Sequence, residues 1–164
     1  MVVPNAIYWV AYRRYRLTNM RILAVDPGSK NIGLAISDPS ASIANPLLVF
    51  THKSRDVDSD MIIEQANKHE VGKIIIGQSL DENGLPTFEG RKSGRLLESV
   101  RRKTTLPVEL CDEGFSTQDA RRTRILMGVS RRNRAGHLDQ IAATIILQSY
   151  LDAHSKGIKT VNEK

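Results

Sequence analysis

The residues best suited to chemistry are acidic side chains in three widely separated segments of the chain. They are Asp26, the adjacent pair Asp112 and Glu113, and Asp139. The first two segments each follow a short apolar run typical of a buried β-strand, and Asp139 opens an apolar helical stripe. Because parallel strands gather functional residues at their carboxyl ends, we expect Asp26 and Asp112–Glu113 at one edge of a sheet, with Asp139 facing it.

Carboxylates brought together in this way repel one another unless a cation neutralises them, so the pattern indicates a divalent metal site. Oxygen ligands without a Cys/His cluster suit Mg²⁺ or Mn²⁺ rather than zinc. The four histidines are scattered and show no metal-ligand spacing. Two of these acids also have an ordinary structural explanation. Asp26-Pro27-Gly28 is common turn chemistry, and an acid such as Asp139 near a helix start complements the helix dipole.

The stretch Arg21–Asp38 predicts a β-hairpin that positions the first acid. Its strands are Arg21–Asp26 and Asn31–Ser37, joined by the turn Pro27-Gly28-Ser29-Lys30. The first strand is apolar on both faces, so we expect it to be buried and central in its sheet. A third strand over Ser42–Thr51 contains Pro46, which favours an edge position.

The remaining chain alternates between helical and strand patterns. The expected elements are a helix capped by Asp58 or Ser59 and ending near Glu70, a strand over Lys73–Gly77, a helix over Thr87–Lys103, a strand over Pro107–Cys111, a short helix from Ser116 to about Met127, a loop over Gly128–Gly136, and a helix from His137 to about His154. This order predicts an α/β fold. A three-stranded antiparallel meander, extended by parallel strands, forms a mixed five-stranded sheet flanked by helices.

Composition is that of one soluble domain with a basic character. The chain has 164 residues, a net charge of +6 and a pI of about 9.7, which favours a polyanionic partner. The single cysteine, Cys111, excludes an internal disulfide, fits the cytoplasm and is expected in the core. No segment is long enough for a membrane span. We expect residues 1–19 to be an extension outside the fold, 20–155 the domain, and 156–164 a tail.

Four segments in order resemble the YqgF/RuvX family of the RNase H-like superfamily. They are Ala24–Ala35, Ile74–Leu80 with Asn83-Gly84, Asp112–Thr117, and Leu138–Tyr150, and they span essentially everything after Met20. The resemblance implies an RNase H-like fold and a cytoplasmic, Mg²⁺- or Mn²⁺-dependent nuclease. It implies processing of the 5′ end of pre-16S rRNA or, alternatively, resolution of Holliday junctions in branched DNA. A monomer and a homodimer both remain open.

The same resemblance implies roles for individual residues. Asp26, Asp139 and an acid of the pair Asp112–Glu113 would bind the metal ions and act in catalysis, with Glu113 preferred over Asp112. Two metal ions would activate a water and stabilise the leaving oxygen. Lys30 could contact a phosphate oxygen, or be a solvated turn lysine. The basic residues that could hold flanking phosphates are Arg121, Arg122, Arg131, Arg132 and Arg134.

The chain departs from the family pattern at two places. Gly77-Gln78-Ser79 replaces Gly-Leu-Pro, which we expect to change only the stiffness of the loop. Gly114 replaces an arginine beside the proposed acids, and Arg121 or Arg122 could substitute for it. Two other interpretations are an ATP-binding lobe of the actin/sugar-kinase type, for which the chain is too short, and a nucleic-acid-binding module that has lost turnover. Metal-dependent cleavage would separate the nuclease from the binding module.

Overall fold

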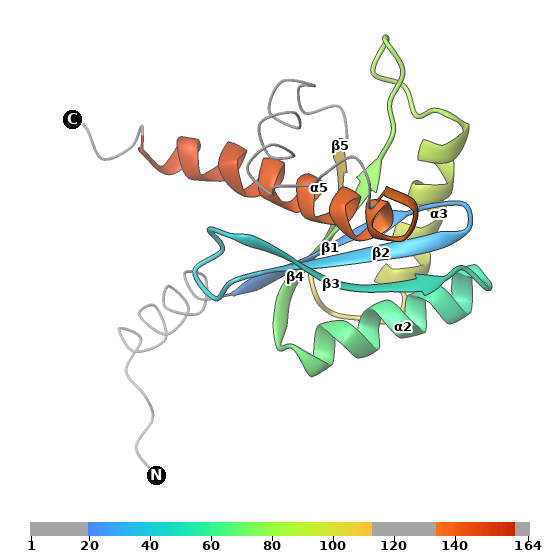
Figure 1. Ribbon diagram of the computed structural model, residues 1–164, viewed down its shortest axis with the longest axis horizontal. Helices are drawn as coiled ribbons and strands as arrows, with labels where there is room; N and C mark the ends of the chain where they lie inside the picture. Colours follow the sequence, from blue (N-terminus) through green and yellow to red (C-terminus); the bar gives the residue numbers. More distant parts are fainter. Residues whose placement is uncertain (1–19, 113–133, 160–164) are drawn as a thin grey trace.

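The computed structural model of the protein describes residues 20–112 and 134–159, with only the backbone described at 134–140 and 155–159. Its elements are β1 (Arg21–Pro27), β2 (Asn31–Ser37), β3 (Ala44–Thr51), α2 (Arg55–Lys68), β4 (Val71–Gln78), α3 (Phe88–Arg101), β5 (Val108–Asp112) and α5 (Arg134–Lys159) (Figure 1). Within these ranges no helix has the length and apolar character required to cross a bilayer.

The sheet has five strands in the order β3-β2-β1-β4-β5. β1 pairs antiparallel with β2 and parallel with β4, and β4 pairs parallel with β5. The predicted mixed sheet, its central first strand and the hairpin are therefore confirmed. β3 lies at the edge, as Pro46 indicated, and its register with β2 is irregular beside that proline.

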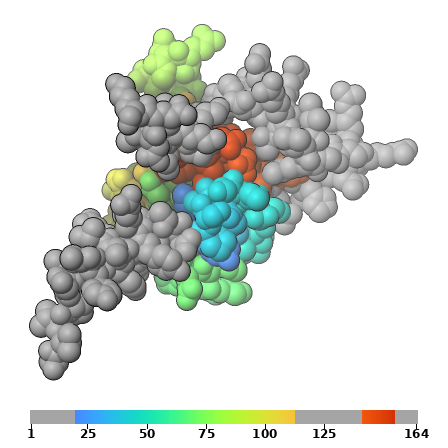
Figure 2. Space-filling view, turned by 90° about the vertical axis from the view of Figure 1, so that its left-hand side faces the viewer, coloured from blue at the N-terminus to red at the C-terminus, as the bar shows by residue number. Residues whose placement is uncertain are grey.

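The two faces of the sheet are covered differently. Leu23 and Val25 of β1 point into a large core beneath α2 and α3, built mainly from leucine, isoleucine and valine. Ala24 points to the opposite face, where small residues let α5 pack against the strands. Figures 1 and 2 show α5 on one side of the sheet and α2 on the other. Cys111, only 4% exposed, belongs to the core beneath α5, as expected.

The turn between β1 and β2 requires glycine at one position. A side-chain carbon on Gly28 would lie 2.4 Å from the carbonyl oxygen of Asn31, which is closer than van der Waals contact allows. The Gly28 amide donates to the Asp26 carbonyl over 3.0 Å. The turn is therefore tight, and it holds Asp26 as the penultimate residue of β1.

The predicted N-terminal cap of α2, at Asp58 or Ser59, is wrong. Ser54 caps α2, and its hydroxyl accepts from the Val57 amide over 3.3 Å. Asp58 and Ser59 lie inside the helix and are buried, 2% and 0% exposed. Asp58 cannot cap because its carboxylate accepts hydrogen bonds from the preceding segment, described below. The cap of α3, by contrast, is at Thr87, where the prediction began that helix.

The last helix begins earlier than predicted. α5 starts at Arg134 rather than His137, so Arg134 is helical and the predicted loop is wrong at its end. Arg134 and Ala135 favour a helix, and a glycine at the third position costs too little to prevent it. Asp139 consequently lies in the second turn, not the first. The short helix predicted over Ser116–Met127 falls outside the described residues.

Candidate active site

Parallel strands β1, β4 and β5 end at one edge of the sheet, which we call the carboxyl edge. It carries Asp26 near the end of β1 and Asp112 at the end of β5. β4 lies between them, with Gln78 paired to Asp112, so the two acids are separated by about 10 Å of sheet. Both residues are partly exposed. The sequence correctly placed these two acids at a shared edge.

Asp26 lines a cavity of about 220 Å³ at this edge, which we call the acid cavity. Its other lining residues are Pro27, Gly28, Ser29, Ser79, Glu89 and Ser93. Glu89, in the first turn of α3, adds a second carboxylate that sequence reasoning missed. Its spacing of four residues from Ser93 places both on one helix face, and this spacing was the available signal. The Glu89 carboxylate forms an ion pair of 3.0 Å with Lys92.

Close packing brings the start of α3 to the acid cavity. A side-chain carbon on Gly90 would lie 2.1 Å from the carbonyl oxygen of Ser79, so only glycine permits this approach. The Thr87 amide donates to the same carbonyl over 3.1 Å. Gln78 donates from its side chain to the Gly90 carbonyl over 3.0 Å. Gln78 thus ties the helix to the sheet, a role beyond the loop stiffness expected from its departure from the family pattern.

Only some of the remaining predicted site residues lie within the described part of the chain. Glu113, Arg121, Arg122, Arg131 and Arg132 lie outside the described residues. Lys30 is exposed in the β1–β2 turn and does not line the acid cavity. Arg134 is the first residue of α5.

The backbone of α5 indicates where Asp139 lies relative to the sheet. Tyr150 contacts Lys73, near the amino end of β4. Asp139 precedes Tyr150 by eleven residues, about 16 Å of helix. Figure 1 shows the first turns of α5 toward the end of the sheet that carries the β1–β2 turn. This placement agrees with the predicted grouping of Asp139 with Asp26, which stays a prediction.

The donor chemistry of the carboxyl edge can be compared with what a metal requires. Within residues 20–112 and 134–159, no three His, Cys, Asp or Glu side chains form a group able to hold a metal. The acids that the edge does carry, Asp26, Glu89 and Asp112, offer only oxygen donors. Such donors fit Mg²⁺ or Mn²⁺ and do not fit zinc.

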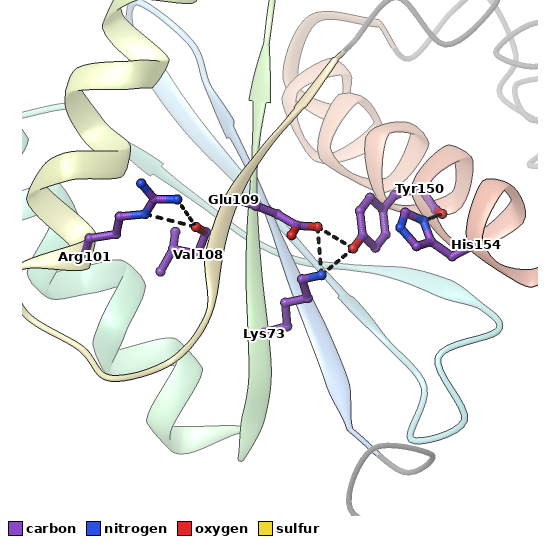
Figure 3. Close-up of polar contacts among 6 residues, drawn as sticks. All are labelled: Lys73, Arg101, Val108, Glu109, Tyr150 and His154. Atoms are coloured by element: carbon purple, nitrogen blue, oxygen red, sulfur yellow. Dashed lines mark hydrogen bonds and ion pairs between the residues drawn. The ribbon is translucent and has the colours of Figure 1, made fainter. Parts of the chain in front are cut away.

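A second polar cluster lies at the opposite, amino end of the same sheet (Figure 3). Lys73 of β4 donates to the Tyr150 hydroxyl over 2.7 Å and forms an ion pair of 2.8 Å with Glu109 of β5. The Tyr150 hydroxyl donates to Glu109. His154 stacks on the Tyr150 ring with centroids 4.0 Å apart. This cluster, which we call the lysine cluster, anchors α5 to the sheet.

Charge neutralisation dominates in the lysine cluster. Burial opposes the charge on Lys73, but hydrogen bonds with Glu109 and Tyr150 outweigh it and raise the pKa of Lys73 above its ordinary value. Burial likewise opposes the charge on Glu109, but hydrogen bonds from Lys73 and Tyr150 lower its pKa. Both groups are therefore held in their charged forms. The cluster stabilises the fold and fixes the helix that carries Asp139.

Comparison with known proteins decides the family. The family model described as "RuvX: Holliday junction resolvase" matches residues 20–153. The chain belongs to the RuvX family. A curated relative from Thermoanaerobacter pseudethanolicus is 38% identical over 82% of this chain and 97% of its own length, and one from Caldanaerobacter subterraneus subsp. tengcongensis is 39% identical over 84% and 100%. Both are named "Putative pre-16S rRNA nuclease".

Solved structures show the fold of this RuvX chain. Thermus thermophilus RuvC in complex with a Holliday junction substrate aligns with a TM-score of 0.54 at 17% identity, over 82% of this chain and 96% of that one. The fowlpox virus resolvase, in complex with Holliday junction DNA, aligns with a TM-score of 0.50 at 16% identity, over 82% and 99%. These likenesses show the RNase H-like fold. The RuvX match contains all four predicted acids, Asp26, Asp112, Glu113 and Asp139.

Proposed function

We propose that this RuvX protein is a metal-dependent nuclease that hydrolyses phosphodiester bonds at the carboxyl edge of its sheet. The observation that carries the proposal is Asp26, which lies next to the last residue of the central strand of an RNase H-like sheet and lines an open cavity. A carboxylate there can both bind a metal and face an entering phosphate. The basic net charge of +6 supports a polyanionic substrate.

Asp26, Asp139 and an acid of the pair Asp112–Glu113, preferably Glu113, would hold Mg²⁺ or Mn²⁺ in a two-metal arrangement. When bound, the metal supplies Lewis-acid polarisation of the phosphoryl oxygens and lowers the pKa of a water. The chain's own residues orient the substrate. Lys30, in the turn beside Asp26, would contact a non-bridging phosphate oxygen, and Arg121, Arg122, Arg131, Arg132 and Arg134 would hold flanking phosphates.

We propose processing of the 5′ end of pre-16S rRNA as the biological reaction, in the cytoplasm. The names of the two curated relatives support it, since each is covered almost completely at more than 35% identity. Branched DNA is the second candidate. The family description and the junction-bound structural neighbours favour it.

The experiment is Mg²⁺- or Mn²⁺-dependent cleavage of a 5′-extended 16S precursor and of a four-way DNA junction, side by side. The variant is Asp26→Asn. The matched control is Asp60→Asn, because Asp60 is an exposed acid of α2 that lines no part of the acid cavity. We expect wild type and Asp60→Asn to cleave the precursor and Asp26→Asn not to. Cleavage of the junction alone would select the DNA substrate, and cleavage of neither would leave a binding module.

A further inference from the structure

A second cavity, of about 300 Å³, lies on the other side of the β1–β2 turn from the acid cavity. We call it the basic cavity. Pro27, Gly28 and Ser29 line both cavities, so one tight turn is their common wall. The residues that give the basic cavity its chemistry are His52, Arg55, Asp58, Lys92 and Arg95.

A buried acid orients the histidine of the basic cavity. Asp58 is 2% exposed, and its Oδ2 lies 2.6 Å from Nδ1 of His52. Its Oδ1 accepts from the Lys53 amide over 3.2 Å. Because a carboxylate can only accept, Nδ1 of His52 carries the proton, and the other ring nitrogen, Nε2, is left for the cavity. Burying a carboxylate is costly unless it is well hydrogen-bonded, so the hydrogen bonds with His52 and Lys53 are what stabilise Asp58 in its buried position.

Cationic side chains surround that histidine. Arg55 begins α2, and Lys92 and Arg95 project from α3. Lys92 is paired with Glu89 over 3.0 Å. In the described part of the chain, Arg55 and Arg95 form no ion pair. Both also line an adjoining hollow of about 480 Å³, whose other charged residues are Arg91, Arg102 and Glu98, so arginines outnumber acids along this part of the α3 surface.

The helical periodicity of α3 places acidic and basic residues in different cavities. Glu89 and Ser93, four residues apart, face the acid cavity. Lys92 and Arg95, three residues apart, face the basic cavity. Because α3 and the turn form parts of both walls, an anion in the basic cavity would be adjacent to a group at Asp26.

We infer that the basic cavity is a phosphate subsite, which holds a phosphate of the substrate strand next to the phosphodiester at Asp26. The inference rests on the proposed function and deepens it. Two arginines provide paired N–H donors that match phosphate oxygens. His52 can add a third contact in its doubly protonated form, in which Nε2 also donates. The phosphate is either an internal backbone phosphate or a 5′-terminal phosphate, which present the same oxygens.

The test measures binding without turnover, in EDTA, by fluorescence anisotropy over a series of salt concentrations. The probes are one single-stranded RNA sequence with a 5′-phosphate and the same sequence with a 5′-hydroxyl, labelled at the 3′ end. The variants are Arg55→Gln/Arg95→Gln and His52→Gln. The control is Lys68→Gln, which removes one positive charge in the last turn of α2, outside both cavities. Thermal unfolding midpoints establish that each variant is folded.

We expect the arginine double variant to weaken binding about tenfold and to reduce the salt slope by about 1.4, which corresponds to two phosphate contacts on a single strand. His52→Gln should weaken binding by a smaller factor, and Lys68→Gln should match wild type. An equal loss on both RNAs identifies an internal phosphate. A loss confined to the phosphorylated RNA identifies the terminal one.

Binding and salt slope in the double variant equal to those of Lys68→Gln would overturn the inference. An equal loss in Lys68→Gln would also overturn it, because the effect would then belong to net charge. Cleavage by wild type is measured separately. If wild type fails to cleave but the binding pattern holds, the nuclease proposal fails and the phosphate subsite stands.

Discussion

The two ends of the central sheet carry similar polar residues in opposite arrangements. At the amino end, Lys73, Glu109 and Tyr150 contact one another, so positive and negative charge are neutralised within one cluster. At the carboxyl end, acidic and basic side chains line neighbouring cavities, and the Glu89–Lys92 ion pair lies between them. Asp26 and Glu89 line one cavity, and Arg55 and Arg95 line the next.

This difference separates a stabilising cluster from a binding one. Mutually bonded charges lock α5 to the sheet and leave little for a ligand to gain. At the carboxyl end, Arg55 and Arg95 form no ion pair within the described residues and can bind an anion, an arrangement that costs stability and is typical of functional sites. The proposed nuclease would use a metal ion and a phosphate side by side, and the carboxyl edge places a cavity lined by Asp26 next to one lined by Arg55 and Arg95.

The largest expected effect is on activity, at the carboxyl edge. Asp26→Asn should lower single-turnover cleavage at saturating Mg²⁺ by about a thousandfold or more, equivalent to about 4 kcal/mol of transition-state stabilisation. Asp139→Asn should do the same. Both variants should keep the wild-type unfolding midpoint and bind nucleic acid, since Asp and Asn have nearly the same size and shape. Wild-type cleavage by either variant would contradict the proposed roles.

The next effect is on stability, at the amino end. Lys73→Met should lower the free energy of unfolding by about 1–2 kcal/mol, because the partly exposed Glu109 and the buried Tyr150 both lose a bonded partner. Urea unfolding measures the change, and Lys68→Met, at an exposed lysine of α2, is the control. An unfolding free energy as high as that of the control would show that the lysine cluster does not anchor α5.

The features of the two ends of the sheet that depend on a local sequence pattern could be predicted, and those that depend on distant partners could not. Strand periodicity placed Asp26 and Asp112 correctly, because each follows its own apolar run. The Ser54 cap and the buried Asp58 were missed because Asp58 is bonded by His52, which lies before the helix. The local sequence around a polar residue in a helix does not reveal such a partner.

Glu89 was also missed, because its place in the site depends on tertiary packing. Its contribution to the acid cavity depends on Gly90 approaching the Ser79 carbonyl, a contact between two elements. The lysine cluster was hidden for the same reason, since Lys73, Glu109 and Tyr150 belong to three elements. The ends of the predicted strands suggested the grouping of the acids, and the family resemblance implied their roles as metal-binding catalytic residues.

A pH series should sharpen the contrast through Glu109. Its pKa is lowered from the ordinary 4.5, so the cluster contributes stability above that value and loses it as pH falls through the lowered folded pKa. The free energy of unfolding should therefore fall between about pH 5 and pH 3 more steeply in wild type than in Glu109→Gln. Parallel curves for the two proteins would show that Glu109 is not held ionised by Lys73.

The smallest effect is expected at Asp38, in the β2–β3 turn. The hydrogen bond from the Ser40 hydroxyl lowers the pKa of Asp38 to about 2. Burial opposes this shift, and hydrogen bonds from the amides of Ile43, Ser42 and Ser40 add to it. Its stabilisation should be present above about pH 4 and be lost as pH falls toward 2. Asp38→Asn should cost about 1 kcal/mol at pH 7 and clearly less at pH 2, as measured by urea unfolding. An equal cost at both values would contradict this.

The most direct measurement is the Mg²⁺ dependence of single-turnover cleavage of the 5′-extended precursor by wild type, Asp26→Asn and Lys73→Met, at a temperature where all three are folded. The separation of a catalytic end from a stabilising end predicts the same metal dependence for wild type and Lys73→Met, and no cleavage by Asp26→Asn at any Mg²⁺ concentration. Cleavage by Asp26→Asn at the wild-type rate, or an equal loss in folded Lys73→Met, would contradict it.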